Sequence, residues 1–314
     1  MEQLAGITLS KKAIEIVTGK LLGDANISNQ TGRKPRFRFS HCLKDRGWCQ
    51  FCYDQLKNDL PLNEPVYRLV KDERIQGGYT EQYYVQSKTH PAIELLKSIW
   101  YTDGKKKLPY LFLEQHLTPL TLAVWYQDDG NLKLKELIPR KITLSTESFS
   151  LVEIEFLQSL LRQKFSLAFS IDSKKRLLLY NQPQIYYFLR LVQPYIHSSM
   201  QRKQFVPRIN EIHFTKKRTT IYLPGDILLT KPTAQIQKQL ENLSYIHTQI
   251  SNEPMNEEFY KEYVLAPQSE ARRGYQIELA PSELQELAKV QALTGLRISR
   301  IMQICFEIEK RPSK

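Results

Sequence analysis

The 314-residue sequence predicts an α+β fold made of two copies of one helix-then-sheet unit, followed by a small C-terminal extension. Three observations lead to this prediction. An apolar helix ending in an acidic residue occurs twice, at Asp24 and at Asp129, which are 129 − 24 = 105 residues apart. Each helix is followed by a segment of alternating character, as expected of a strand with one buried face. Beyond about residue 208 the pattern changes.

The first copy begins with a helix expected over residues 10–27, because Ser10 is a suitable N-cap and apolar residues recur at helical spacing as far as Leu22. After a polar turn, an alternating strand at 36–41 places Phe37, Phe39 and His41 on one face. The remaining predicted elements are a helix at 44–58, strands near 65–73 and 79–87, and a helix at 90–102.

The second copy repeats this order. A helix is expected at 118–130, with Pro119 in its first turn, where proline is well tolerated. The elements that follow are an alternating strand at 140–146, a helix at 150–164, strands near 166–172 and 175–181, and a helix over about 183–195. Such self-similarity indicates an internal duplication.

The C-terminal extension is expected to contain a polar helix at 232–250, a linker at 251–274, and a strand, helix and helix over 275–310. Pro281 begins the first of these two helices, Gly295 ends it, and Ser299 is a suitable cap for the second. The expected domains are therefore 1–104 for the first copy, 105–208 for the second, 209–274 as linker or extension, and 275–314 as a small module.

The composition favours a polyanionic partner. Lys plus Arg number 45 and Asp plus Glu 33, which gives a formal charge of +12, and nucleic acid is the commonest partner of such a surface. No apolar run approaches the roughly 20 residues that span a bilayer. The N-terminus lacks a secretory pattern, and four cysteines do not make a disulfide framework. We expect an intracellular protein with no membrane partner, in an organelle (chloroplast or mitochondrion) or a bacterial cytoplasm.

The two strongest motifs are VTGKLLGDA at 17–25 and LAVWYQDDG at 122–130. Gly19 and Gly23 are four residues apart, so they share a helix face and permit close approach of a second helix. If the two helices pack side by side, their C-terminal ends bring Asp24 and Asp129 together. Helix C-termini carry partial negative charge, so two carboxylates there are costly unless they hold cations. Hard divalent ions with oxygen ligands suit such a site.

These segments resemble the paired LAGLIDADG motifs of homing endonucleases, specifically the monomeric two-motif enzymes encoded in introns. LTPLTLAVWYQDDG at 117–130 is the more specific match, whereas LLGDANI at 21–27 has Ala25 where the motif usually has glycine. The resemblance covers about residues 10 to 206. It implies duplicated αββαββα units forming a pseudo-twofold DNA-binding saddle. It also implies hydrolysis of both strands of a long double-stranded DNA target with Mg²⁺ or Mn²⁺, which would drive copying of the insertion that encodes the enzyme.

The resemblance also implies roles for individual residues. The last acidic residue of each motif is the catalytic metal ligand in this family, which corresponds to Asp24 and Asp129, and Asp128 would be a neighbour. Basic residues near the metals correspond to Lys106 and Lys203, which would polarise water or offset transition-state charge. The alignment leaves the two lysines on either side of Lys106 as alternatives.

The outward strand faces are the expected DNA-binding surface, because alternating strands can direct polar side chains at bases and phosphates. The alternative is that these residues are polar because they face water. The candidates are Arg36, Arg38, Ser40, Arg68, Gln82, Tyr84, Gln86, Lys88, Lys141, Thr143, Ser145 and Lys175.

Two further constellations have alternative interpretations. Cys42, Cys49 and Cys52 with His41 have partly chelating spacing, but His41 and Cys42 would point to opposite strand faces, so we interpret the cysteines as buried thiols. The tail at 275–310 resembles a ribbon-helix-helix module, in which Gln276 and Glu278 would face bases and residues 219–224 would supply a second strand. The alternative is a helical hairpin that packs on the nuclease or mediates self-association.

The sequence therefore predicts a metal-dependent DNA endonuclease with a monomeric core and double-stranded DNA as its partner. Two alternatives remain on the same fold. One is a maturase that helps its intron RNA to splice, and the other is a non-catalytic DNA-binding regulator. Self-association of the tail stays open.

Overall fold

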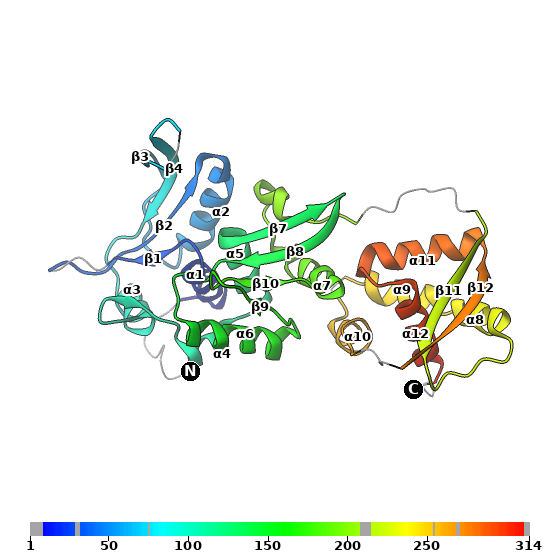
Figure 1. The fold of residues 1–314 in the computed structure, drawn as a ribbon. Helices are drawn as coiled ribbons and strands as arrows, with labels where there is room; N and C mark the ends of the chain where they lie inside the picture. Colours follow the sequence, from blue (N-terminus) through cyan, green and yellow to red (C-terminus); the bar gives the residue numbers. More distant parts are fainter. Residues whose placement is uncertain are drawn as a thin grey trace. The chain divides into compact units, whose positions relative to one another are not determined.

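The computed structural model describes residues 9–28, 32–74, 76–207, 215–253, 255–267 and 271–310. The chain divides into two compact units (Figure 1). Met1–Leu179 with Val192–Gln204 form the core unit, and Tyr180–Leu191 with Phe205–Lys314 form the C-terminal unit. Among the described residues, no helix combines the length and the apolar character needed to cross a bilayer.

The first repeat of the core unit contains a four-stranded antiparallel sheet in the order β1-β2-β4-β3 (Figure 1). Its elements are α1 (Lys11–Leu22), β1 (Asn26–Ile27), β2 (Phe37–Cys42), α2 (Arg46–Leu56), β3 (Val66–Lys71), β4 (Tyr79–Gln86) and α3 (Pro91–Trp100). Alternation in β2 is confirmed, because Phe37, Phe39 and His41 are all buried.

The second repeat has the same topology, with sheet order β7-β8-β10-β9. Its elements are α5 (Pro119–Asp129), β7 (Gly130–Lys135), β8 (Ile138–Leu144), α6 (Leu151–Phe165), β9 (Ser170–Ile171) and β10 (Leu177–Leu179). The duplication extends to strand register. Asn26 lies opposite Arg38 in the first sheet, and Asn131 lies opposite Thr143 in the second, so both pairs are related by 105 positions.

Helices α1 and α5 pack directly against each other, as their sequences predict. A Cβ atom built on Gly19 would lie 2.6 Å from the Thr121 carbonyl oxygen, and one on Gly23 would lie 2.6 Å from Asp128 Cβ. Any larger side chain at these two positions would force the helices apart. This close approach places the C-terminal ends of α1 and α5 at the centre of the core unit (Figure 1).

Several expected boundaries in the core unit were wrong. The first helix ends at Leu22, not at residue 27, because Gly23 leaves the helical conformation and Asn26–Ile27 pairs with β2. Strand β7 was missed, since it follows α5 without any turn signal. The strand expected at 166–172 is reduced to Ser170–Ile171. Three short connecting elements were also missed, namely β5 (Tyr101–Thr102), β6 (Lys105–Lys106) and α4 (Tyr110–His116).

The C-terminal unit contains a two-stranded antiparallel ribbon, β11·β12, and several helices. Its elements are α7 (Gln182–Val192), whose last residue belongs to the core unit, β11 (Lys217–Pro224), α8 (Pro232–Leu240), α9 (Leu243–Ser251), α10 (Glu257–Phe259), β12 (Arg272–Leu279), α11 (Pro281–Thr294) and α12 (Ile298–Glu309). Ile221, Leu223, Ile277 and Leu279 form the buried face of the ribbon.

The range 209–274, expected as linker or extension, contains regular secondary structure over much of its described length. It contains β11, two helices in place of the single helix expected at 232–250, and the segment from Phe259 to Val264, four of whose six residues are buried. Gly295 ends α11 with a φ of +68°, as expected. Ser299 does not cap α12, because the helix begins one residue earlier and the Ser299 hydroxyl instead accepts a hydrogen bond from the Tyr222 backbone N–H at 3.1 Å.

Candidate active site

The C-terminal ends of α1 and α5 bring three acidic residues together. Asp24 follows the last turn of α1, while Asp128 and Asp129 end α5. The Asp24 backbone N–H donates to Asp128 Oδ2 at 3.2 Å. Burial, together with the negative charges of Asp24 and Asp128, raises the pKa of Asp129 to about 7. The two carboxyls expected from the repeated motif therefore lie within electrostatic reach of each other.

The environments of Asp24 and Asp129 are not equivalent. Burial raises the pKa of Asp24, but the hydrogen bond from His41 and the positive charge of Lys20 outweigh it and hold this pKa below its usual value. His41 Nδ1 lies 3.3 Å from Asp24 Oδ2. Among the described side chains, none donates a hydrogen bond to the Asp129 carboxylate. The fold therefore favours the charged form of Asp24 and disfavours the charged form of Asp129.

Asp128 is already saturated by protein donors. Its side chain is fully buried and receives hydrogen bonds from Lys20 Nζ, at 3.0 and 2.9 Å, and from Trp48 Nε1 at 2.8 Å. Asp24, His41 and Asp128 lie close enough to form a metal-ligand set, with ligand atoms within 4.8 Å of one another. However, the Lys20 ammonium already neutralises Asp128.

Asp24 and Asp129 are the better fit to a divalent cation. Mg²⁺ is commonly held by one or two carboxylates together with water and substrate phosphate oxygens, which matches an incomplete protein ligand set. Burial raises the pKa of Asp129 most, and the negative charges of Asp24 and Asp128 add to this rise, which a bound cation would oppose.

The two expected lysines lie at corresponding points of the two repeats. Lys106 Nζ donates to the Ala25 carbonyl at 2.9 Å, just beyond α1. Lys203 Nζ donates to the last carbonyls of α5, at 3.0 Å for Tyr126 and 3.2 Å for Asp128, and also to Gln127. Burial lowers the pKa of each lysine to about 8. The residues on either side of Lys106 are exposed, so the structure favours Lys106 among the three alternatives.

The first sheet gathers most of the expected DNA-binding residues on one face. Arg38 lies opposite Gln86, Ser40 opposite Tyr84, and Gln82 opposite Arg68. The Arg68 guanidinium lies 4.0 Å from the centre of the Tyr84 ring. Lys88 is exposed just beyond the end of β4.

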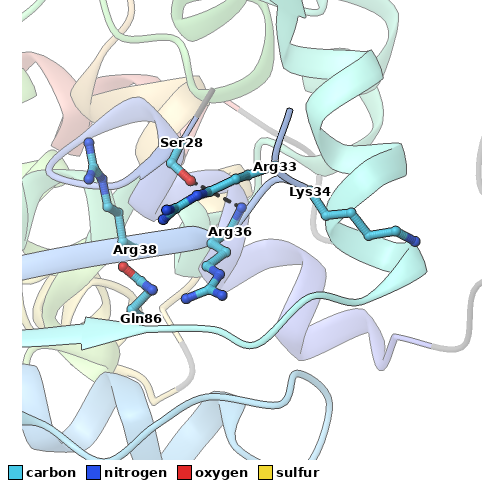
Figure 2. Close-up of a pocket in the computed structure, with 6 residues that line it drawn as sticks. All are labelled: Ser28, Arg33, Lys34, Arg36, Arg38 and Gln86. Carbon is cyan, nitrogen blue, oxygen red and sulfur yellow. Dashed lines mark hydrogen bonds between the residues drawn. The ribbon is translucent and has the colours of Figure 1, made fainter. Parts of the chain in front are cut away.

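A polar pocket lies at the β1 end of this face (Figure 2). It is lined by Ser28, Arg33, Lys34, Arg36, Arg38 and Gln86. Arg38 Nε donates to Asn26 Oδ1 at 2.5 Å. The Lys34 side chain points away from the arginines in Figure 2, and its Nζ lies 3.0 Å from Glu94 Oε1. Sequence reasoning missed Ser28, Arg33 and Lys34 as lining residues, although the basic turn that precedes Arg36 was a usable signal.

The second sheet has a corresponding groove. It is lined by Asn131, Leu132, Lys133, Leu134, Lys141, Thr143, Ser145 and Arg176. Two expected residues of β8, Lys141 and Thr143, are therefore brought together here with Ser145, which follows the strand. The contribution of β7 was missed along with the strand itself. Lys175 lies exposed in the neighbouring turn, at a φ of +62°.

The cysteines behave differently from one another. Cys49 and Cys52 are buried in α2, and burial raises the pKa of Cys49 to about 11. Cys42 is exposed at the end of β2, so the expectation of a buried thiol was wrong there. Its Sγ donates to Asp45 Oδ2 at 3.3 Å, and it points away from His41 because successive strand residues face opposite sides.

The ribbon expected in the tail is present within one chain. Strand β11 includes residues 219–224 and pairs with β12 over eight positions. Gln276 and Glu278 are exposed on the outer face, and Glu278 lies 3.4 Å from Lys216 Nζ. The second strand is confirmed, while base contact by Gln276 and Glu278 stays a prediction.

Three site residues were missed by sequence reasoning, namely Lys20, His41 and Trp48, which contact Asp24 or Asp128. A usable signal for Lys20 was a lysine between Gly19 and Leu21 on an otherwise apolar helix face. For His41 the signal was its place in register with two buried phenylalanines.

The fold and the site define a class of protein: two fused copies of an α+β unit with an acidic, lysine-flanked centre where their first helices meet. A profile of the LAGLIDADG DNA endonuclease family matches residues 14–188, more than half of the chain, and the chain belongs to that family. The expected fold class is thereby confirmed.

Individual relatives are distant. Cytochrome b mRNA maturase bI2 of Debaryomyces hansenii is 26% identical over 213 residues, covering 62% of this chain and 74% of the relative. Probable intron-encoded endonuclease 1 of Wickerhamomyces canadensis is 27% identical over 208 residues, covering 62% and 85%. Protein RecA of Mycolicibacterium chitae is 30% identical over 215 residues, 64% of this chain, and the match spans about half (48%) of that relative.

One solved structure, the homing endonuclease I-WcaI bound to its DNA recognition sequence, shares the fold. Its TM-score is 0.55 at 24% identity, with 62% of this chain and 87% of that chain covered.

Proposed function

We propose that this chain is a site-specific endonuclease that hydrolyses both strands of a long double-stranded DNA target with a divalent cation. The observation that carries the proposal is the meeting of Asp24 and Asp129 at the ends of two packed helices, each with a buried lysine beside it. Membership of a DNA endonuclease family supports it.

In this proposal, Asp24 and Asp129 hold Mg²⁺ or Mn²⁺. The bound cation supplies an activated water and offsets charge on the phosphate. Lys106 and Lys203 keep ammonium groups beside the carboxylates, where they stabilise the additional negative charge of the pentacoordinate phosphate. A pKa of about 8 still leaves most of each lysine protonated near neutral pH, as this role requires.

The two strand faces are the proposed DNA interface. The duplication provides one face for each half of a target, as protein twofold symmetry commonly does for half-sites. The faces of the first sheet and the β8 groove supply the base and phosphate contacts, and Lys88 and Lys175 add charge beside them. Both halves of the centre belong to one chain, so a monomer suffices for cleavage. The proposed location is an organelle (chloroplast or mitochondrion) or a bacterial cytoplasm, where such a DNA target would be available.

The test is a cleavage selection. Purified full-length chain is incubated with Mg²⁺ and a DNA library that includes the joined flanks of its own coding sequence, and the cut ends are sequenced. Asp24→Asn and Asp129→Asn are run beside Asp54→Asn, which changes an exposed carboxylate on α2. Discrete double-strand breaks that disappear in the first two variants and persist in the third support the proposal. DNA binding without cutting, equal in all four proteins, refutes it.

A second candidate is RNA splicing assistance. A relative at 26% identity is named as an mRNA maturase, and the core is shared with it over 62% of this chain. This candidate predicts tight binding of the intron RNA that is unaffected by Asp24→Asn and Asp129→Asn, with splicing of that RNA as the readout. A regulator on the same fold would bind DNA and show neither activity.

A further inference from the structure

An ion pair lies buried between the two repeats. Lys20 comes from the middle of α1 and Asp128 from the end of α5, and both side chains are completely buried. Burial alone lowers the pKa of Lys20, but the charges of Asp128 and Asp24 outweigh it, so this pKa is raised and the ammonium stays charged. Buried pairs of this kind add little net stability, and fixing a specific arrangement is their best-attested use.

His41 links this ion pair to the proposed metal ligand. Its Nε2 lies 2.6 Å from Lys20 Nζ, and its Nδ1 lies 3.3 Å from Asp24 Oδ2. An ammonium group only donates hydrogen bonds, so Nε2 must be the acceptor and the ring proton must sit on Nδ1. Nδ1–H then donates to the Asp24 carboxylate. The ring is buried in β2 beside Phe39, which restricts its rotation.

In the part of the second repeat that the structure describes, there is no such chain of contacts. Position 146 corresponds to His41, because 41 + 105 = 146, and it is occupied by Thr146. The Thr146 hydroxyl donates to the Lys175 carbonyl in its own repeat. Position 125, which corresponds to Lys20, is Trp125. The Asp129 carboxylate therefore lacks the counterpart of the His41 contact among the residues that the structure describes.

We propose that His41 is a positioning residue that orients the Asp24 carboxylate, and that the buried Lys20–Asp128 pair fixes it in the Nδ1–H tautomer. This arrangement orients only the Asp24 carboxylate, in the first half of the centre. The expected effect on cleavage rests on the proposed function. If each half of the centre cuts one DNA strand, cleavage of the two strands would depend unequally on His41. The tautomer itself is independent of that function.

The first test needs no cleavage and no metal. The ¹⁵N shifts of the His41 ring are recorded by NMR at neutral pH on full-length protein. A protonated Nδ1 and an unprotonated Nε2 are expected. In the double variant Lys20→Met with Asp128→Leu, which removes the ion pair without leaving a buried charge unpaired, a mixture of tautomers is expected. A protonated Nε2 in the unsubstituted protein overturns the proposal, and so does an unchanged Nδ1–H tautomer in the double variant.

The second test separates positioning from a merely structural role. Nicking of each strand is followed on a supercoiled plasmid carrying the target site. His41→Leu is expected to slow one strand by about 10- to 100-fold, the usual effect of losing a group that orients a metal ligand, and the other strand far less. His41→Asn, whose amide nitrogen can replace Nδ1–H, restores much of the rate. Thr146→Ala is the matched control and introduces no comparable strand bias.

Equal slowing of both strands by His41→Leu refutes a one-sided role. If the unsubstituted protein cuts no DNA at all, the proposed function fails, while the NMR result still decides whether His41 is held as described.

Discussion

Replacing Asp129 by asparagine should stabilise the metal-free protein while abolishing the proposed cleavage. Burial and the charges of Asp24 and Asp128 raise the Asp129 pKa from 3.8 to about 7. A shift of about 3 units corresponds to at most about 4 kcal/mol, at roughly 1.36 kcal/mol per unit. Asp129 is partly exposed, so solvent screening reduces this figure, and we expect a gain of about 1–2 kcal/mol at pH 8.

The sign of the pH dependence follows from the direction of the shift. Between about pH 4 and 7 the folded protein binds a proton at Asp129 that the unfolded chain has released, so stability falls as pH rises through this window. Above pH 7 the penalty is complete, and below pH 4 it is absent. Asp129→Asn should therefore stabilise the fold at pH 8 and have little effect near pH 4.

Tryptophan fluorescence measures this change in the core unit alone. The three tryptophans of the chain, Trp48, Trp100 and Trp125, are buried in that unit. In EDTA at pH 8, a gain of about 1–2 kcal/mol should raise the melting temperature by about 2–8 °C, given roughly 2–4 °C per kcal/mol for a unit of this size. Mg²⁺ should narrow the difference in melting temperature between Asp129→Asn and the unsubstituted protein, because it binds and stabilises the unsubstituted protein.

Asp24→Asn is the matched variant with the opposite expected sign. The fold holds the Asp24 pKa below its usual value through His41 and Lys20, so asparagine loses a favourable charge and should lower the melting temperature at pH 8. A fall in melting temperature for both variants, or a rise for both, would refute the assignment of unequal environments to the two carboxyls.

Three further predictions concern the surroundings of the centre. Gly19→Ala should destabilise the core by about 1–3 kcal/mol in urea unfolding, since its Cβ would overlap the Thr121 carbonyl oxygen; an unchanged midpoint contradicts the close helix packing. Lys203→Met should reduce single-turnover cleavage by about 10²- to 10³-fold, and a rate within threefold of the unsubstituted protein would exclude a catalytic role. Arg202 holds Asp45 through hydrogen bonds of 2.7 and 2.8 Å and keeps its pKa low, so Arg202→Ala should cost about 1 kcal/mol at pH 7. That cost should disappear as pH falls through the lowered Asp45 pKa, and a cost that is constant with pH would contradict the ion pair.

Much of the fold could be predicted from the sequence because the duplication repeats every signal. The close approach of the helices followed from Gly19 and Gly23, and the polar face of β2 followed from its alternation. Strand β7 was missed although residues 131–135 alternate between polar and apolar, because it continues directly from α5 and none of its residues is fully buried. Within the C-terminal unit, residues 251–274 were expected as a linker, since a composition rich in Pro, Asn and Gln suits a linker as well as short helices and turns.

The candidate site divides along a similar line. The sequence could name Asp24 and Asp129 because each is the last acidic residue of a family motif. It could name Lys106 and Lys203 because the family places basic residues at these points. The contact between Lys20 and the second repeat depends on which residues of α1 face which residues of α5. A single motif does not specify this register. A buried charge on an apolar helix indicates that a partner exists, but only three-dimensional packing identifies it.

The residues that meet between the repeats also explain why the two copies are not interchangeable. Gly23 and Asp128 are equivalent positions, 105 residues apart, and they face each other across the helix contact at a separation that excludes a second side chain. Two copies of the first repeat would leave the buried Lys20 ammonium without the Asp128 carboxylate that pairs with it. Two copies of the second repeat would place two Asp128 side chains against each other where only one side chain fits. Each alternative buries uncompensated charge, which is strongly unfavourable. The Lys20–Asp128 pair therefore selects the pairing of unlike halves, and the same pair places His41 against Asp24 in one half alone.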